Sequence, residues 1–396
     1  MNTHIVLKKG KAKPFWAGNP LVFSGAIERV VGQPEPGDLV SLADHGGTVI
    51  GTGVFNPHSQ YRVRLLALEG DRCDSSSIDA LVARRVADAL ALRSALGLPS
   101  DSTTAFRVLN SEGDRCSGLT IDLFADVAVV ASSAFWTERH RPALTAALEQ
   151  SLKPRVVVWR QVRSALSHDG WTAFSAPADQ PPASLPVEIL EHGIRYRIDA
   201  GKGQKTGFYC DQRDNRLLVR SVAKNRRVLD LYCYSGGFSL NAAAGGASSV
   251  RGVDSSAQAI EAARANAALN NAANVEFVTA NVQQELAAAA GYDFIIIDPP
   301  KLAPSAGHAP RALKLYRSLA AAALGRLPAH GLLLLCSCSA AVMHADLVEA
   351  LRDASLEAGV RPAILTVTHH PADHPVLAAF TDGAYQSAVL AAKSNG

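Results

Sequence analysis

The stretch Phe294-Ile295-Ile296-Ile297-Asp298-Pro299-Pro300-Lys301 is an apolar run that ends abruptly in an acidic residue and a proline turn. Such a run predicts a strand that is buried on both faces of a sheet. Similar runs occur on either side of it, separated by Ala-rich helical stretches, and they are Val228–Leu231, Val250–Val253, Val275–Val278 and Leu332–Leu335. This alternation predicts an α/β fold with a Rossmann-like, doubly wound sheet of parallel strands.

Two chemically capable groups follow strands of this predicted sheet. Asp298 comes directly after the strand at 294–297, and Cys338 follows the strand at 332–335. In open α/β sheets, ligands bind beyond the carboxyl ends of the strands. We therefore expect a reaction centre at this edge, with Asp298 and Cys338 on neighbouring strands.

The bulk properties predict a soluble protein of two or three domains, because the chain has 396 residues of which 19% are charged. A net charge of +3 says little about partners, although Lys8, Lys9, Lys11 and Lys13 form a cluster that fits either a polyanion or a solvated face. The six cysteines lack metal-binding spacing, so we expect no metal site. No run approaches the roughly 20 apolar residues of a membrane span. No secretory signal is visible, and free thiols fit the cytoplasm.

Three domains are expected, over residues 1–75, 76–183 and 184–396. The first is expected to be a small β-barrel with strands over Val22–Ile27, Leu39–Leu42, Thr48–Phe55 and Arg62–Leu66. The second is expected to be α+β, with a helix that Ser75–Ser77 caps and that runs to Gly97, and with a hairpin over Leu119–Asp122 and Val127–Ala131. A Pro-, Ala- and Ser-rich linker over 176–186 leads to the third domain.

The strand Val228–Leu231 leads into the turn Tyr232-Cys233-Tyr234-Ser235-Gly236-Gly237-Phe238. A strand, a turn of small residues and a helix place backbone N–H groups and the positive end of the helix against a ligand. The next strand ends at Asp254, where a carboxylate can bind ribose hydroxyls. The alternative is that the glycines only make a tight turn and that Asp254 only caps the next helix.

This predicted pocket differs from a dinucleotide site, because the G-x-G-x-x-G spacing is absent. Asp230 brings an anion to the first loop, which suits an ammonium group better than a phosphate. S-adenosylmethionine carries an ammonium, a ribose and an adenine but no phosphate, so we expect it to be the cofactor. Asn281, after the third strand, is expected at the adenine edge.

Strand geometry favours Cys338 over Cys336 as the reactive thiol. The two side chains share one face, but only Cys338 lies beyond the end of the strand, and Cys336 is expected in the core. A thiolate beside a methyl donor suggests methylation of carbon 5 of a pyrimidine. Attack on carbon 6 makes an enamine, carbon 5 takes the methyl group, and loss of the carbon 5 proton and the thiolate completes the cycle. The thiol, with an ordinary pKa of about 8.5, must be activated by its surroundings.

The turn formed by Pro299 and Pro300 is expected to hold Asp298 against the edge of the base. A base in a structured nucleic acid must be unstacked to enter such a pocket. Nearby cations are candidates for phosphate contacts, with ordinary helix-surface charge as the alternative, and they are Lys301, Arg311, Lys314 and Arg317.

Several motifs together resemble those of the RlmI-type bacterial large-subunit rRNA cytosine-5 methyltransferases: Lys205-Thr206-Gly207-Phe208-Tyr209, Asp211-Gln212-Arg213, Ser235-Gly236-Gly237-Phe238, Asp298-Pro299-Pro300-Lys301, Ser337-Cys338-Ser339 and Asp373-His374-Pro375. The resemblance covers essentially the whole chain. It implies an N-terminal PUA RNA-binding module, a central α+β domain and a Rossmann-type catalytic domain. It also implies S-adenosylmethionine as methyl donor and a cytosine of 23S rRNA as acceptor.

By position in these motifs, the resemblance implies that Cys338 is the nucleophile and that Asp298 is the acid facing cofactor and base. The expected cofactor-binding residues are Phe208, Gln212, Arg213, Asp230, Tyr234, Ser235, Gly236, Gly237, Phe238, Asp254, Ser255, Asn281 and Asp298. The expected substrate-binding residues are Pro299, Pro300, Lys301 and Lys314. The chain departs from the family pattern at Asn281, where an acid is usual, and at the additional Cys336.

Two other functions are weighed against this hypothesis. An RNA methyltransferase that acts on an exocyclic nitrogen would need no thiol, and an aromatic residue in place of Lys301 would have favoured it. A non-catalytic RNA-binding or ribosome-assembly factor would bind RNA without responding to S-adenosylmethionine. His374 is either a proton carrier, a substrate contact or a structural residue, and a homodimer is left open.

Overall fold

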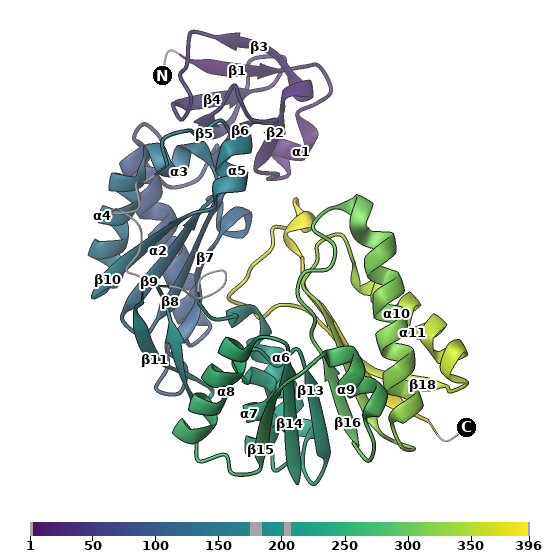
Figure 1. Cartoon of the computed structure of the whole chain (residues 1–396). Coiled ribbons are helices and arrows are strands. Elements are labelled where there is room, and N and C mark those ends of the chain that lie inside the picture. Colours follow the sequence, from purple (N-terminus) through teal and green to yellow (C-terminus); the bar gives the residue numbers. More distant parts are fainter. Residues whose placement is uncertain (1–2, 175–183, 202–206, 395–396) are drawn as a thin grey trace. The chain divides into compact units, whose positions relative to one another are not determined.

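The computed structural model of the chain describes residues 3–174, 184–201 and 207–394 (Figure 1). Most of the predicted linker over 176–186, together with Lys205 and Thr206, lies outside these described residues. The chain divides into two compact units. The first comprises Met1–Ile189, Ile198–Cys210 and Ala372–Gly383, and the second comprises Leu190–Arg197, Asp211–Pro371 and Ala384–Gly396.

The N-terminal part of the first unit is a six-stranded sheet in the order β2-β6-β5-β4-β1-β3. Its elements are β1 (His4–Leu7), α1 (Lys13–Trp16), β2 (Leu21–Phe23), β3 (Ile27–Val31), β4 (Leu39–Ala43), β5 (Val49–Phe55) and β6 (Tyr61–Leu68). Fully buried aliphatic side chains such as Ile5, Val40 and Leu65 form its core. The single strand predicted over Val22–Ile27 is wrong, because a 3₁₀ turn at Ser24–Ala26 separates β2 from β3.

The rest of the first unit is built on a four-stranded sheet in the order β10-β9-β8-β7. Its elements are α2 (Ile78–Ala95), β7 (Ala105–Asn110), β8 (Leu119–Phe124), β9 (Val127–Ser132), α3 (Phe135–Arg139), α4 (Arg141–Leu152), β10 (Val156–Gln161) and α5 (Arg163–His168). The predicted antiparallel hairpin is confirmed as β8–β9. The predicted helix is confirmed as α2, and the Ser77 side chain caps it by accepting a hydrogen bond from Ala80 N.

The segment Ala372–Gly383 contains the Asp373-His374-Pro375 motif and belongs to the first unit. The Asp373 carboxylate accepts a hydrogen bond from Arg107 N at 2.9 Å, and its carbonyl oxygen accepts one from the Arg93 guanidinium at 2.6 Å. Pro375 O accepts a hydrogen bond from the Asn110 side chain at 3.0 Å. His374 is fully buried, so the structure favours the structural interpretation of this motif.

The second unit is built on a seven-stranded sheet in the order β15-β14-β13-β16-β17-β19-β18. The strands are β13 (Arg227–Leu231), β14 (Ser249–Asp254), β15 (Val275–Thr279), β16 (Phe294–Ile297), β17 (Leu332–Ser337), β18 (Pro362–Thr368) and β19 (Ser387–Lys393). All five predicted parallel strands are confirmed, and β16 lies beside β17 as expected. Strands β18 and β19, which were not predicted, complete the sheet in antiparallel pairing.

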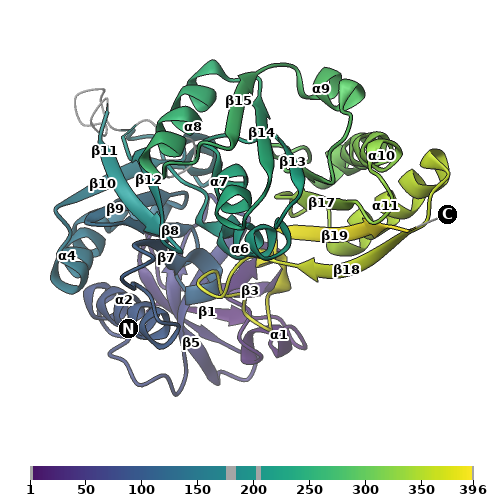
Figure 2. The same ribbon diagram turned by 90° about the horizontal axis from the view of Figure 1, so that it is seen from below.

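Helices cover both faces of this sheet (Figure 2). Helices α6 (Arg213–Val222) and α7 (Gly237–Ala244) pack on one face with side chains such as Phe294 and Cys336. Helix α8 (Ala257–Leu269) packs against Phe277 of β15. Helices α9 (Val282–Ala288), α10 (Ala309–Arg326) and α11 (His344–Ala358) pack on the other face. The short ribbon β11 (Pro186–Glu191) and β12 (Ile194–Asp199) precedes them in the chain.

Candidate active site

The parallel strands bring most of the predicted polar residues to one edge of the sheet. Asp230 and Asp254 lie at the carboxyl ends of β13 and β14, and Asn281 follows β15. Asp298 and Cys338 follow the neighbouring strands β16 and β17. Because parallel strands end at the same edge, the sequence order of these residues becomes a row across the sheet.

A direct hydrogen bond links the loop after β16 to the turn after β17. The Ser339 hydroxyl accepts a hydrogen bond from Ala303 N at 3.1 Å, and Ser339 N donates to the Ser337 hydroxyl at 3.3 Å. This arrangement ties the turn that carries Cys338 to the loop that begins at Asp298. Cys338 itself is half-buried.

Cys336 is confirmed as a core residue, since its side chain is fully buried between the sheet and helices α6 and α7. Burial raises the pKa of its thiol well above the ordinary value, and the charges of Asp298 and Asp230 raise it further. A thiol in this state stays protonated and is a poor nucleophile.

The turn after β13 has the backbone geometry expected of a ligand-binding loop. Gly236 has a φ of +86°, and a Cβ at this position would lie 2.7 Å from the Phe277 ring. Tyr232 and Tyr234 also have positive φ values, of 65° and 48°. Non-glycine residues in this region cost about 1–3 kcal/mol each and cluster at functional sites.

Asp254 supports this turn from the next strand. One of its carboxylate oxygens accepts a hydrogen bond from Tyr234 N at 3.1 Å, and the other accepts one from Ser256 N at 2.9 Å. Asp254 therefore shapes the turn as well as the start of α8. The carboxylate remains half-buried rather than sealed in the core.

The carboxyl group of Asp230 is strongly perturbed by its surroundings. Its Oδ2 accepts hydrogen bonds from Ser239 N at 2.9 Å and from the Ser239 hydroxyl at 2.6 Å. Burial raises the pKa of its carboxyl group to about 7, and the charge of Asp298 contributes in the same direction. Among the described residues, no group donates a hydrogen bond to the buried Oδ1. A ligand with an ammonium group, as S-adenosylmethionine has, would supply the missing charge and donor.

The remaining predicted cofactor residues fall into two groups. Phe208, Arg213, Ser235, Gly237 and Phe238 are buried, whereas Ser255 and Asn281 are exposed. The amide oxygen of Asn281 caps α9 by accepting hydrogen bonds from Gln283 N and Gln284 N. A contact with adenine through this oxygen would compete with the cap, so the amide nitrogen is the better group to meet an adenine.

Gln212 contacts Asp298, a relation that the sequence did not indicate. The Gln212 side chain is buried and donates a hydrogen bond from Nε2 to Asp298 Oδ1 at 2.9 Å. Two residues that sequence reasoning missed, Asn215 and Thr368, continue this hydrogen-bond chain. No motif marks them, because Thr368 lies more than 150 positions away from Asn215.

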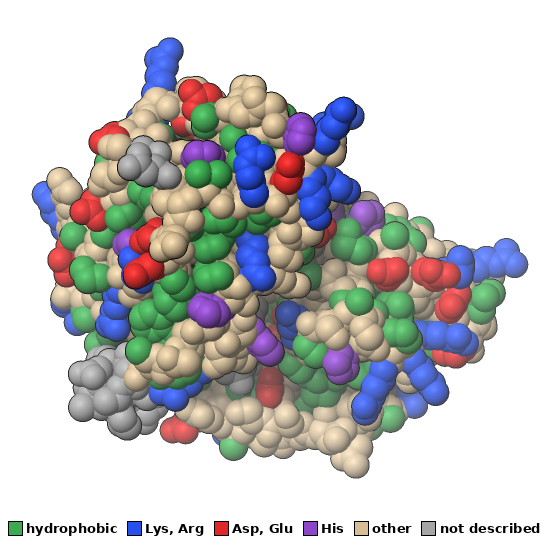
Figure 3. Space-filling view, turned by 90° about the horizontal axis from the view of Figure 1, so that it is seen from above, with side chains coloured by type: hydrophobic (Ala, Val, Ile, Leu, Met, Phe, Trp, Pro, Cys, Tyr) green, Lys and Arg blue, Asp and Glu red, His purple; other side chains and the backbone are tan. Residues whose placement is uncertain are grey.

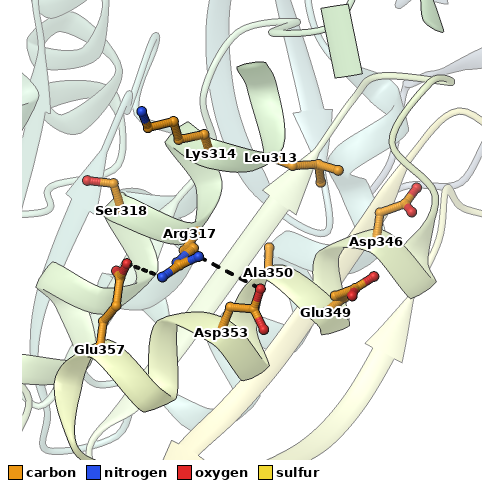
Figure 4. A pocket seen from close by; sticks show the side chains of 9 residues that line it. All are labelled: Leu313, Lys314, Arg317, Ser318, Asp346, Glu349, Ala350, Asp353 and Glu357. Atoms are coloured by element: carbon orange, nitrogen blue, oxygen red, sulfur yellow. Dashed lines mark ion pairs between the residues drawn. The ribbon is translucent and has the colours of Figure 1, made fainter. Parts of the chain in front are cut away.

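The four predicted phosphate-binding cations differ in their surroundings. Lys301 and Arg311 are exposed, as is Pro300, whereas Pro299 is buried. Arg317 forms ion pairs with Asp353 and Glu357 of α11, at 4.0 Å and 2.5 Å, and therefore joins α10 to α11 (Figure 4). On the face seen in Figure 3, Lys and Arg side chains stand singly or in small groups among other residues.

Lys314 lines a groove of about 570 Å³ between α10 and α11 (Figure 4). Four carboxylates also line this groove, from Asp346, Glu349, Asp353 and Glu357. Their negative charge opposes binding of a phosphate backbone, so we do not expect RNA to bind in this groove.

The described residues also bear on the expectations about a membrane span and a metal site. No helix among the described residues is long and apolar enough to cross a membrane. Within the same residues, no group of three or more His, Cys, Asp or Glu side chains could hold a metal ion.

Comparisons with known proteins agree with this geometry. Residues 120–361 match the S-adenosylmethionine-dependent methyltransferase family, which is the class that the fold and the site define, and residues 5–68 match a PUA-like domain. The chain is 34% identical to ribosomal RNA large subunit methyltransferase I of Escherichia coli K12, over 97% of this chain and 98% of that protein. The chain belongs to the family of ribosomal RNA large subunit methyltransferase I.

Solved structures share the fold over nearly the whole chain. SMU.776, a putative methyltransferase complexed with SAH, matches with a TM-score of 0.80 and 22% identity, covering 98% of this chain and 99% of that one. A putative methyltransferase from Streptococcus mutans matches with a TM-score of 0.78 and 21% identity, with the same coverage. The predicted fold class, PUA-like module and cofactor are thereby confirmed.

Proposed function

We propose that this protein transfers a methyl group from S-adenosylmethionine to carbon 5 of a cytosine in large-subunit (23S) rRNA, through a covalent bond between Cys338 Sγ and carbon 6. One observation carries this proposal: a half-buried thiol lies at the edge of the sheet where the parallel strands end, on a turn that is hydrogen-bonded to the Asp298 loop. The similarity to ribosomal RNA large subunit methyltransferase I of Escherichia coli supports ribosomal RNA as the substrate.

Residues of β13, β14 and the following loops would hold the cofactor, which supplies the methyl group when bound. Asp230 would pair with its ammonium, and the Tyr234–Gly237 turn would contact it with backbone N–H groups. Asp254 would bind the ribose hydroxyls and Asn281 the adenine. The remaining expected cofactor contacts include the buried residues Arg213 and Phe238.

The thiol of Cys338 would act after losing its proton to its surroundings. The thiolate forms a bond to carbon 6 of the cytosine, and the electron pair of the 5,6 double bond makes carbon 5 nucleophilic. Carbon 5 would take the methyl group from S-adenosylmethionine, which would leave as S-adenosylhomocysteine. The carbon 5 proton would then pass to a basic group or to water, the 5,6 double bond would re-form, and the thiolate would leave. Asp298 would accept a hydrogen bond from the exocyclic amine of the base, which presents a donor at that position.

RNA contacts outside the reaction centre would come from exposed cations and from the N-terminal module. Lys301 and Arg311 would contact phosphates beside the flipped cytosine. Residues 1–75 would form the RNA-binding module, 76–183 the central domain and 184–396 the catalytic domain. A ribosomal RNA substrate would place the protein in the cytoplasm.

Methylation mapping tests this proposal directly. Purified protein is incubated with labelled S-adenosylmethionine and ribosomal RNA from cells that lack the protein, and the product is analysed by bisulfite sequencing. We expect label on carbon 5 of a cytosine in the large-subunit RNA. Label on an exocyclic nitrogen, together with full activity of a Cys338→Ala variant, would instead establish an N-methyltransferase.

A further inference from the structure

A chain of three buried or half-buried side chains leads from the end of β18 to Asp298. The Thr368 hydroxyl donates to Asn215 Oδ1 at 2.5 Å, and Asn215 Nδ2 donates to Gln212 Oε1 at 2.6 Å. Gln212 Nε2 then donates to Asp298 Oδ1 at 2.9 Å. All three bonds point the same way, so the chain delivers an N–H donor to the carboxylate.

The two amide side chains of this chain are buried, which makes their hydrogen bonds costly to break. Asn215 is 0% exposed and Gln212 is 4% exposed. A buried amide that loses its hydrogen-bond partner remains desolvated without compensation, which is unfavourable by about 1–3 kcal/mol. Each side chain is therefore held in its observed orientation.

Two of the elements that carry the chain are also held by contacts outside it. Gln212 ends the 3₁₀ turn Cys210–Gln212 directly before α6, and the adjacent Asp211 accepts a hydrogen bond from the Tyr385 hydroxyl at 2.9 Å. Thr368 ends β18, where it pairs with Ala388 of β19. The backbone at both ends of the chain is therefore held by contacts that do not involve the chain itself.

We propose that Gln212 is a positioning residue for methyl transfer, oriented through Asn215 by Thr368, and that it fixes the Asp298 carboxylate as an acceptor for the incoming base. An acceptor at this point suits the amino group of cytosine, whereas the corresponding oxygen of uracil is itself an acceptor. Gln212 thus acts on the base through Asp298 rather than on the cofactor. This inference rests on the proposed function.

Three variants of the full-length protein and one control variant test the hydrogen-bond chain in steady-state assays with S-adenosylmethionine and undermethylated large-subunit RNA. Gln212→Leu removes the donor at similar volume, and we expect kcat to fall by about 10- to 100-fold, as misplacement of a reacting group does. Thr368→Val removes the far end of the chain, and a smaller fall of roughly 3- to 10-fold is expected. Thr368→Ser retains the hydroxyl group and should have a kcat close to that of the wild type. Thr366→Val makes the same change two residues earlier on β18 and serves as the matched control.

Two further readouts separate positioning from loss of structure or cofactor. If Gln212 acts by positioning Asp298 rather than by binding the donor, calorimetry with S-adenosylhomocysteine should give affinities within about threefold of wild type for Gln212→Leu and Thr368→Val. The acid limb of the kcat–pH profile should move to higher pH, since a carboxylate that loses a donor is more easily protonated. Other titratable groups near Asp298 are unchanged in these variants, and they are Asp230 on β13, Tyr316 on α10, and Cys336 and Cys338 on and after β17.

Two results would overturn the inference. One is a Gln212→Leu protein with kcat within twofold of wild type, and the other is a fall in S-adenosylhomocysteine affinity as large as the fall in kcat. If Gln212→Leu does not fold, the comparison of Thr368→Val, Thr368→Ser and Thr366→Val decides in its place. Wild-type protein that leaves carbon 5 unmethylated would refute the proposed function itself, which is a different outcome from a dispensable Gln212.

Discussion

Asp230 makes the stability of the catalytic unit depend on pH, because burial raises the pKa of its carboxyl group from the ordinary 3.8 to about 7. The folded protein therefore keeps a proton near neutral pH that the unfolded chain loses near pH 4. The stabilisation that this carboxyl group contributes is fully present below its pKa in the unfolded chain. It is lost as the pH rises to the pKa of the group in the folded protein. A shift of about 3 units corresponds to about 4 kcal/mol in total, of which about 2–3 kcal/mol falls between pH 5 and pH 8.

Asp230→Asn tests this reasoning, because the amide does not titrate and its oxygen can still accept from Ser239. The free energy of unfolding is measured by denaturant titration with circular dichroism, for both proteins at pH 5 and pH 8. We expect the variant to gain about 2–3 kcal/mol relative to wild type between the two pH values. The constant cost of burying the amide nitrogen cancels in this difference.

The same variant links stability to cofactor binding. Removal of the anion should weaken S-adenosylhomocysteine binding in calorimetry, and the affinity of the wild type should fall as the pH drops through about 7. An equal stability difference at pH 5 and pH 8 would refute the buried-carboxyl account. Unchanged affinity in Asp230→Asn would refute the ammonium contact.

Three further variants probe other parts of the structure. Gly236→Ala places a Cβ 2.7 Å from the Phe277 ring at a residue with a φ of +86°. Denaturant titration should show that the free energy of unfolding falls by about 1–3 kcal/mol. An unchanged free energy of unfolding would mean that the turn relaxes freely. Asp373→Ala removes the partner of Arg107 N and should cost about 2–4 kcal/mol in the first unit. Tryptophan fluorescence reports this loss, because all four tryptophans lie in that unit, and an unchanged thermal midpoint would contradict it. Cys336→Ala should retain methyl transfer within about threefold, and loss of activity at wild-type stability would reassign the nucleophile.

Local sequence patterns were sufficient for the parallel sheet and for the residues at its edge. Apolar runs between Ala-rich helices predicted all five parallel strands, and the expected end of the last one correctly separated the buried Cys336 from the half-buried Cys338. These features depend on neighbours in the chain, because strand ends and turn residues are encoded within a few positions.

Features that depend on distant contacts were not predictable. Strand β19 has the sequence Ser387–Lys393, whose alanines suggest no strand, and it forms only because β17 and β18 flank it. The pairing of Arg317 with α11 and the hydrogen-bond chain to Asp298 join segments far apart in sequence. A single sequence contains no signal for such pairs, since each residue type is also common on ordinary surfaces.

Covalent trapping tests the central chemical claim most directly. RNA that carries 5-fluorocytosine at the target position lacks the carbon 5 proton, so the bond between sulfur and carbon 6 cannot be released after methylation. With S-adenosylmethionine present, wild-type protein and Cys336→Ala should form a protein–RNA complex that survives denaturing electrophoresis, and Cys338→Ala should form none. A trapped complex of equal yield with Cys338→Ala, or no complex with a wild-type protein that methylates unmodified RNA, would contradict the account.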